Sequence, residues 1–249
     1  MTATERRAVL LATAGLALAA GCATRNAVAP PVRPSSRAPS APPTLPSGPA
    51  LPVQLTHGPR DRPRVALTFH GGGDPTTARA LLTEAEKHGA RVTVLAVGTW
   101  LDAHPDLARR IRDGGHDLGN HTLRHLDINA MSEAEARAEI AGCAERLKRL
   151  TGSVGSWFRP SRTPTASPLV TRLAQEAGYP HVLSYDVDSL DFTSPGPAAV
   201  ARKVLAEIRE GSVVSMHFGY ADTVAALPVV LEELARRGLA AVTTTELFS

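Results

Sequence analysis

The sequence predicts an α/β fold in which a parallel sheet is covered by helices, either doubly wound or closed as a barrel. Short apolar runs alternate with longer segments whose apolar residues recur at helical spacing. Repeated strand and helix units with right-handed crossovers imply parallel strands. Polar residues gather at the carboxyl ends of the expected strands, where parallel α/β folds carry their functional sites.

Residues 1–22 predict an export signal. Arg6 and Arg7 precede an apolar run, residues 8–21, that is too short to span a bilayer as a helix. The run ends in the sequence LAAGC at Cys22, which resembles the lipobox of bacterial lipoproteins, where the cysteine is acylated. We therefore expect a lipid anchor at Cys22 that holds the protein on the outer face of the cell membrane. An ordinary cleaved signal, which would give a secreted protein, is the alternative.

Residues 23–63 predict a disordered spacer. This segment holds more than half of the chain's 20 prolines and is rich in Ala and Ser. Such a composition buries too little apolar surface to offset the entropy lost on ordering the chain. The spacer would hold a folded domain away from the membrane and within reach of a cell wall.

Residues 64–249 predict that folded domain. Ser132 and Glu135 form a capping box that begins a long helix ending near Gly152. On this helix Cys143 shares helical spacing with apolar residues, which favours core packing over a reactive thiol. The expected strands are 64–69, 91–97, 157–158, 181–185, 212–217 and 239–243, and the expected helices are 77–88, 107–112, 132–151, 168–177, 198–209 and 223–237.

The charge of the chain argues against one class of partner. The formal net charge of +3 is mild, and no block of Lys and Arg is interleaved with aromatic residues. The sequence therefore predicts no nucleic-acid binding.

Side chains that can do chemistry follow five successive strand ends. They are His70, Asp74, His121, His125, Arg159, Asp186, Asp188, Asp191 and His217. Because parallel strands bring their carboxyl ends to one rim, we expect these side chains to converge. One helical turn between His121 and His125 would place both imidazoles on the same side, within reach of a single metal ion.

Four segments resemble, in chain order, motifs of the NodB-type polysaccharide deacetylases. These are metal-dependent enzymes of carbohydrate esterase family four with a distorted parallel (β/α) barrel, and the resemblance implies that fold here. The segment 119–125 is similar to the family's His-Ser/Thr-x-x-His metal motif, and Phe158-Arg159-Pro160 resembles the start of its Arg-x-Pro motif. The segment 186–192 is similar to its Asp-rich motif, and 214–217 resembles its last motif.

The resemblance implies a role for each matched residue. His121 and His125 would bind the metal, which would be zinc, or else cobalt or nickel. Arg159 would steady the catalytic base. His217 would be the general acid, tuned by Asp191.

The first motif departs from the family pattern. The family reads Thr-Phe-Asp-Asp-Gly, with a catalytic base followed by a metal ligand, whereas this chain reads Thr-Phe-His-Gly-Gly from residue 68. His70 then takes the position of the base, and the metal keeps only two protein ligands where a catalytic zinc usually has three. Asp74, after a pliable loop of three glycines, is the expected third ligand. Its alternative role is to cap the helix that begins near Thr77.

Together these features predict a hydrolase that removes acetyl groups from a cell-wall or extracellular polysaccharide, such as peptidoglycan or a chitin-like glycan. N-deacetylation is the reaction that we expect most. The altered first motif favours an alternative, a catalytically impaired, membrane-anchored glycan-binding module on the same fold. A third interpretation is a structural barrel whose polar groups satisfy one another.

Overall fold

The computed structural model describes residues 51–249, so the expected export signal and Cys22 lie outside the described residues. The fold begins earlier than expected, because β1 (Gln54–Leu55) pairs in parallel with β5 (Val182–Leu183). Leu55 is buried in the same apolar cluster as Leu183. Residues 54–63 therefore belong to the folded part and not to the spacer predicted up to residue 63. Buried Leu55 and backbone hydrogen bonds from Ser184 to Leu55 and from Gly58 to Gly211 join this stretch to the barrel.

The main sheet is parallel and follows the order β4-β3-β2-β7-β6. Single bridges from Asn120 to Phe158 and from Phe158 to Val182 carry the ring onward from β4 to β5. The strands thus form the expected distorted parallel (β/α) barrel, with no ladder between β5 and β6 among the described residues. The strands of the sheet are β2 (Arg64–Gly71), β3 (Thr93–Ala96), β4 (Asp117–Asn120), β6 (Val187–Asp188), β7 (Val213–His217) and β8 (Ala240–Ala241), the last of which pairs with the start of β2.

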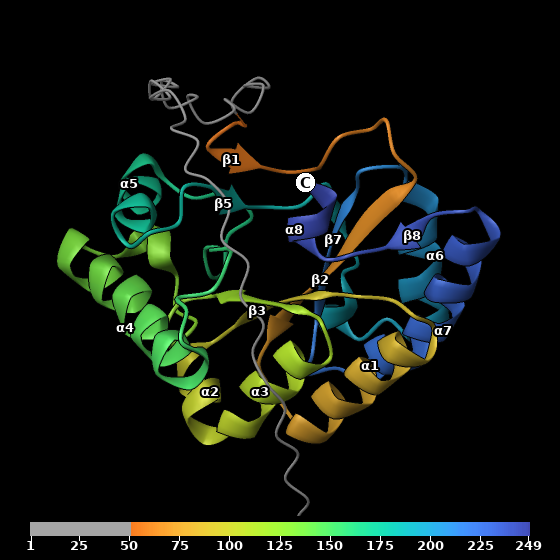
Figure 1. Cartoon of the computed structure of the whole chain (residues 1–249), viewed down its shortest axis with the longest axis horizontal. Helices are drawn as coiled ribbons and strands as arrows, with labels where there is room; N and C mark the ends of the chain where they lie inside the picture. The colour runs from red at the N-terminus through yellow and green to blue at the C-terminus, as the bar shows by residue number, and fades with distance from the viewer. Residues whose placement is uncertain (1–50) are drawn as a thin grey trace, which may run out of the picture. The chain divides into compact units, whose positions relative to one another are not determined.

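Helices surround the strands on the outside (Figure 1). The capping box at Ser132 and Glu135 is present and begins α4. The expected helices are confirmed, but α2 and α8 escape prediction because six and four residues give too little periodicity to detect. The helices are α1 (Pro75–Lys87), α2 (Gly98–Ala103), α3 (Pro105–Asp113), α4 (Glu133–Thr151), α5 (Pro168–Glu176), α6 (Pro197–Glu207), α7 (Ala221–Arg236) and α8 (Thr244–Leu247), with short 3-10 turns η1 (Ile128–Ala130) and η2 (Asp191–Thr193).

Alternation along β2 decides which of its side chains face the barrel interior. Phe69 packs outward into the main apolar core, to which α1 and α7 contribute. Ala66 belongs instead to an inner cluster with residues of β3 and β7. Since strand side chains alternate with a period of two, Thr68 and His70 share the inner face with Ala66. The last inward position of β2 therefore brings His70 to the mouth of the barrel.

Cys143 is a core residue, as predicted. It is fully buried on α4, and its thiol donates a hydrogen bond to the carbonyl of Ala96 over 3.3 Å. Burial raises the pKa of the Cys143 thiol to about 12, which keeps it in the unreactive protonated form at neutral pH.

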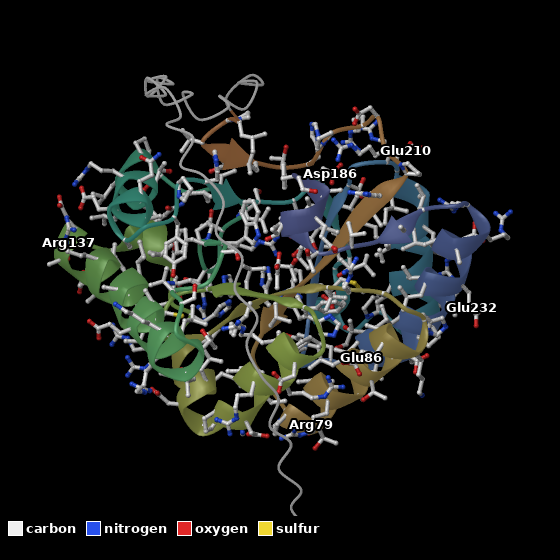
Figure 2. The ribbon with its side chains drawn as sticks, viewed as in Figure 1. Arg79, Glu86, Arg137, Asp186, Glu210 and Glu232 are labelled. Carbon is white, nitrogen blue, oxygen red and sulfur yellow. The ribbon has the colours of Figure 1, made fainter. Side chains whose placement is uncertain are left out.

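Charged side chains lie on the outer surface, as the labelled Arg79, Arg137 and Glu232 show at the periphery of Figure 2. Arg137 pairs with Glu133 at 3.1 Å and with Glu176 at 2.6 Å, which links α4 to α5. Because these groups are about half exposed, such pairs contribute little to stability. Within residues 51–249, no helix has the length and apolar character needed to cross a membrane.

Candidate metal centre

Three histidines from two segments meet at the mouth of the barrel. His70 ends the inner face of β2, and His121 and His125 lie in the loop after β4. One candidate ligand atom from each ring lies within 4.8 Å of the others. The ring centroids of His70 and His121 are 4.3 Å apart, and those of His121 and His125 are 4.8 Å apart. These three residues are called the histidine cluster below.

The loop that carries two members of the cluster is not the helical turn expected from their spacing. Thr122 and His125 both have left-handed backbone conformations, with φ of 67° and 58°. Asn120 Oδ1 accepts a hydrogen bond from the Thr122 N–H at 2.8 Å, and Thr122 Oγ1 accepts one from the His125 N–H at 3.2 Å. These side-chain bonds hold a turn that a non-glycine residue adopts only at some cost. The turn, rather than a helix, brings the two rings together.

The orientation of His121 suits a metal ligand. Its Nδ1 donates a hydrogen bond to the carbonyl of Arg159 over 3.0 Å, which leaves a lone pair on Nε2. That Nε2 is buried and has no hydrogen-bond partner. Burial, and next the charge of His125, hold the pKa of His121 well below its usual value, so the ring is neutral. A buried, unpartnered and neutral imidazole nitrogen fits a divalent metal ion.

His70 and His125 are also favoured in the neutral form. Burial, followed by the charges of His121 and His217, holds the pKa of His70 well below its ordinary value. Burial and the charge of Arg162 lower the pKa of His125. Ser215 Oγ lies 3.4 Å from His70 Nε2, the one hydrogen-bond contact of that ring among residues 51–249. The other ring nitrogen of His70 is therefore available.

Asp74 does not lie with the histidine cluster. Its Oδ1 accepts a hydrogen bond from the Thr76 N–H at 2.7 Å and caps α1, the alternative role considered from the sequence. The glycine loop has a packing reason instead. At Gly73, whose φ is 85°, a Cβ would stand 2.6 Å from the Cα of Gly219, and Trp100 Nε1 donates to the Gly73 carbonyl over 2.9 Å. The loop is fixed against its neighbours, and the third side chain beside His121 and His125 is the imidazole of His70 rather than a carboxylate.

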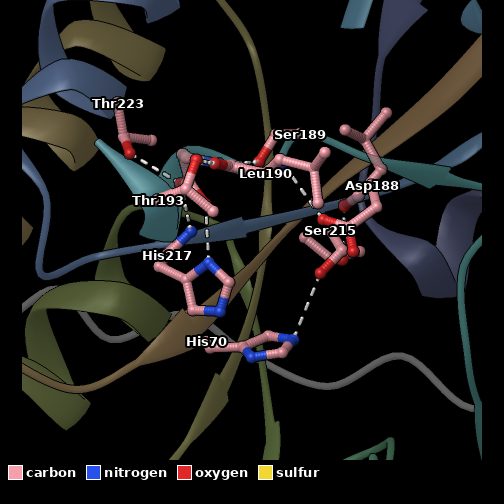
Figure 3. Close-up of polar contacts among 11 residues, drawn as sticks. His70, Asp188, Ser189, Leu190, Thr193, Ser215, His217 and Thr223 are labelled. Atoms are coloured by element: carbon pink, nitrogen blue, oxygen red, sulfur yellow. Dashed lines mark hydrogen bonds and ion pairs between the residues drawn. The ribbon is translucent and has the colours of Figure 1, made fainter. Parts of the chain in front are cut away.

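His217 is oriented by a buried aspartate. Its Nδ1 lies 2.7 Å from Asp191 Oδ1, and Asp191 Oδ2 accepts hydrogen bonds from the His217 N–H at 2.8 Å and from the Thr223 hydroxyl at 2.6 Å (Figure 3). Burial alone would raise the pKa of Asp191, but the hydrogen bonds from His217 and Thr223 outweigh it and lower that pKa. The His217 and His70 ring centroids are 4.4 Å apart. The expected pairing of His217 with Asp191 is thus present beside the cluster.

Arg159 lies fully buried beneath the site. Its Nε and Nη2 donate to the carbonyls of Leu183 and Ser184 over 3.1 Å and 3.0 Å, whereas Nη1 has no partner. Burial lowers the pKa of Arg159 to about 10, so it remains charged at neutral pH. Its charge contributes to the lowered pKa of His70. Arg159 therefore acts on the histidines through its field, because no hydrogen bond joins it to the His70 ring.

Two cavities meet at His70, His125, His217 and Tyr220. The larger, of about 590 Å³, also has Gly72, Gly73 and Trp100 in its wall. The smaller, of about 370 Å³, also has Arg162, Tyr185, Asp188, Phe192 and Ser215 in its wall. His70 and His125 of the histidine cluster thus lie where the two cavities join into a longer groove, a shape that suits a chain-like ligand.

These features define the class of protein. It is a parallel (β/α) barrel with a candidate metal centre and a histidine and aspartate pair at the carboxyl ends of its strands. The family model described as polysaccharide deacetylase matches residues 57–182, and the chain belongs to that family. Members of this family are metal-dependent, and the histidine cluster is a possible metal site.

Known proteins agree with this assignment. The chain is 31% identical over 193 residues to a peptidoglycan-N-acetylglucosamine deacetylase of Bacillus cereus, a match that spans 76% of this chain and 90% of that protein. A crystal structure of a peptidoglycan N-acetylglucosamine deacetylase with a bound N-hydroxybenzamide derivative superposes with a TM-score of 0.74 at 26% identity, covering 79% of this chain and 92% of that one. A carbohydrate esterase family four pseudoenzyme from Bacillus anthracis gives 0.75 at 23% identity, covering 80% and 70%, and supports the fold alone.

Proposed function

We propose that this chain is a metal-dependent deacetylase that removes the acetyl group from N-acetylated sugars of peptidoglycan or a related cell-wall glycan. The single observation that carries the proposal is the buried, unpartnered Nε2 of His121, aimed from a ring that two other neutral imidazoles flank. His70 replaces Asp74 as the third ligand in this proposal. The names of the similar deacetylases support the substrate class.

The histidine cluster would hold a zinc ion, since neutral imidazoles are ligands that zinc favours. When bound, zinc would polarise the acetyl carbonyl and lower the pKa of a nearby water. The protein's own contribution follows from the His217 and Asp191 pair. With Nδ1 fixed on Asp191, the His217 Nε2 is free to donate a proton to the departing amine. The groove on both sides of the cluster would hold neighbouring sugars.

Acetate release tests the proposal directly. The purified full-length chain, loaded with zinc, is incubated with peptidoglycan and with N-acetylated chitooligomers, and acetate is measured. We expect release that a chelator abolishes and that zinc restores. His121→Ala should be inactive, whereas His88→Ala, a change of a surface histidine at the end of α1, should leave activity unchanged. No acetate from either glycan in the presence of zinc would overturn the proposal.

We also propose that the protein is exported and held at the outer face of the cell membrane by a lipid on Cys22. The apolar run and the LAAGC sequence support this location. Cell fractionation tests it, because Cys22→Ser should move the protein from the membrane fraction to the soluble one. Membrane retention of that variant would contradict the anchor.

A second function, a glycan-binding module without catalysis, has one observation in its favour. The first motif contains neither of the two aspartates that the family pattern carries, and no carboxylate joins the histidine cluster among the described residues. Binding to peptidoglycan that persists in chelator, with no acetate released, would support this module. Metal-dependent acetate release would exclude it.

A further inference from the structure

The proposed function does not yet assign a general base. With His70 in the ligand set, no side chain at the end of β2 remains to take the proton of the attacking water. A general base needs a titratable group that faces the reacting atoms. Of all the residues that form the walls of the two cavities beside the histidine cluster, Asp188 is the only carboxylate.

The register of the sheet places Asp188 on the face that carries the site. Asp188 of β6 pairs with Ser215 of β7, and Ser215 pairs with Thr68 of β2. Paired residues of parallel neighbours point to the same face, so Asp188 shares the inner face with His70 and His217, which lie two positions further along their strands. Figure 3 shows Asp188 beside Ser215, whose hydroxyl is the contact of the His70 ring.

The carboxylate of Asp188 is held in place at the wall of the smaller cavity. Its Oδ1 accepts a hydrogen bond from the Leu190 N–H over 3.1 Å. Within residues 51–249, Asp188 forms no ion pair, and its carboxylate also faces the Tyr185 hydroxyl, whose pKa is raised by burial and then by the Asp188 charge. Asp188 is part of the wall of the smaller cavity, together with His70 and His217.

The surrounding charges favour a negative group at this place. Arg162 is part of the wall of the same cavity. The buried Arg159 lies behind Tyr185, with its guanidinium carbon 5.4 Å from the centre of that ring, and its Nη1 has no partner. Two positive groups thus lie near the Asp188 carboxylate, so the charges at this place are complementary.

We propose that Asp188 is the general base of the reaction, in place of the aspartate that the first motif lacks. The inference rests on the proposed deacetylase function. As the water oxygen bonds to the acetyl carbonyl carbon, one water O–H bond breaks and its proton passes to Asp188. The C–N bond then breaks, and His217 gives its proton to the amine nitrogen. The products are acetate and a free amino sugar, and solvent carries the proton from Asp188 back to His217.

Substitution with chemical rescue tests the role. Asp188→Asn and Asp188→Ala should lower kcat by about 10²- to 10⁴-fold, the usual loss for a general base. Bound zinc per chain should stay unchanged, since Asp188 is not in the ligand set. Added formate should restore part of the activity of Asp188→Ala, because a small carboxylate can enter the space vacated. The matched control is Asp127→Asn, an exposed aspartate in the loop after His125, which should keep full activity.

The outcomes separate the two proposals. An active unmodified chain whose Asp188→Asn variant keeps kcat within about threefold would overturn the role of Asp188 alone. Loss of zinc from the Asp188 variants would also overturn it, because it would make Asp188 a ligand. An unmodified chain that holds zinc but releases no acetate would overturn the deacetylase function and this inference with it. A kcat loss that formate reverses, with zinc retained, would establish the general base.

Discussion

The Nδ1 of His121 donates to the carbonyl of Arg159 over 3.0 Å, and this one bond fixes which nitrogen of a buried ring faces the histidine cluster. The contact joins the loop after β4 to the residue that follows Phe158. Phe158 itself forms single bridges to Asn120 of β4 and to Val182 of β5. A backbone carbonyl thus sets the tautomer of a side chain 38 residues away.

Zinc binding should depend on His121. We expect His121→Ala to bind zinc at least 100-fold more weakly than the unmodified chain, because one of three ligands is lost. Titration with a zinc indicator measures the affinity. The surface variant His88→Ala should bind as the unmodified chain does. Equal affinity of all three proteins would mean that the cluster is not the metal site.

Asp74 should matter for stability and not for metal binding. Its carboxylate caps α1, so Asp74→Ala should lower the free energy of unfolding by about 1 kcal/mol. Asp74→Ser should recover most of that loss, since a serine hydroxyl can accept the same bond from Thr76. Urea unfolding gives the free energies. If Asp74→Ala instead lost its zinc, the carboxylate would be a ligand after all.

The pair of Asp191 and His217 should control the rate. Asp191→Asn keeps the shape but removes the negative charge that faces the His217 Nδ1, so kcat should fall about 100-fold or more. Thr223→Val removes one hydrogen bond to Asp191 Oδ2 and should cost about 1 kcal/mol of stability with a smaller loss of rate. Initial rates of acetate release and urea unfolding compare the two variants. A fast Asp191→Asn enzyme would contradict the role of the pair.

A buried histidine away from the site should make stability depend on pH. His116 is buried, and its Nδ1 accepts a hydrogen bond from the Val92 N–H at 3.1 Å. Burial lowers its pKa, although Glu86 opposes this and Arg110 and Arg91 add to it. Below about pH 6.5 the unfolded chain therefore binds a proton at His116 that the folded chain does not bind. The free energy of unfolding then falls as the pH falls, by up to about 1.4 kcal/mol per pH unit.

The test is the difference between the unmodified chain and His116→Asn. Asparagine can accept the bond from Val92 but does not titrate, so its unfolding free energy should fall less steeply between pH 6.5 and pH 5. Other buried histidines titrate in both proteins, and their effect cancels in the difference. Parallel curves would contradict a lowered pKa of His116.

The sequence by itself determined the elements and the side of the barrel that carries the site. The periodicity of the apolar residues predicts most of the strands and helices, and the capping box at Ser132 marks where α4 begins. The burial of Cys143 follows from its spacing on that helix. These features could be predicted because they depend on residues a few positions apart, whose geometry the local backbone fixes.

Only the tertiary structure decided which side chains meet. His70 joins His121 and His125 because the registers of β2 with β3 and of β3 with β4 bring the ends of these strands to one rim. Asp74 turns to α1 because the glycine loop is packed against Gly219. The meeting of the three histidines is not written in local spacing, since it depends on contacts between segments far apart in the chain. The cap formed by Asp74 is local, and the sequence offered it as an alternative, but only the packing of the glycine loop decided between the two roles. The physical reason is that periodicity fixes the direction of a side chain within its own element, whereas packing and register fix its neighbours.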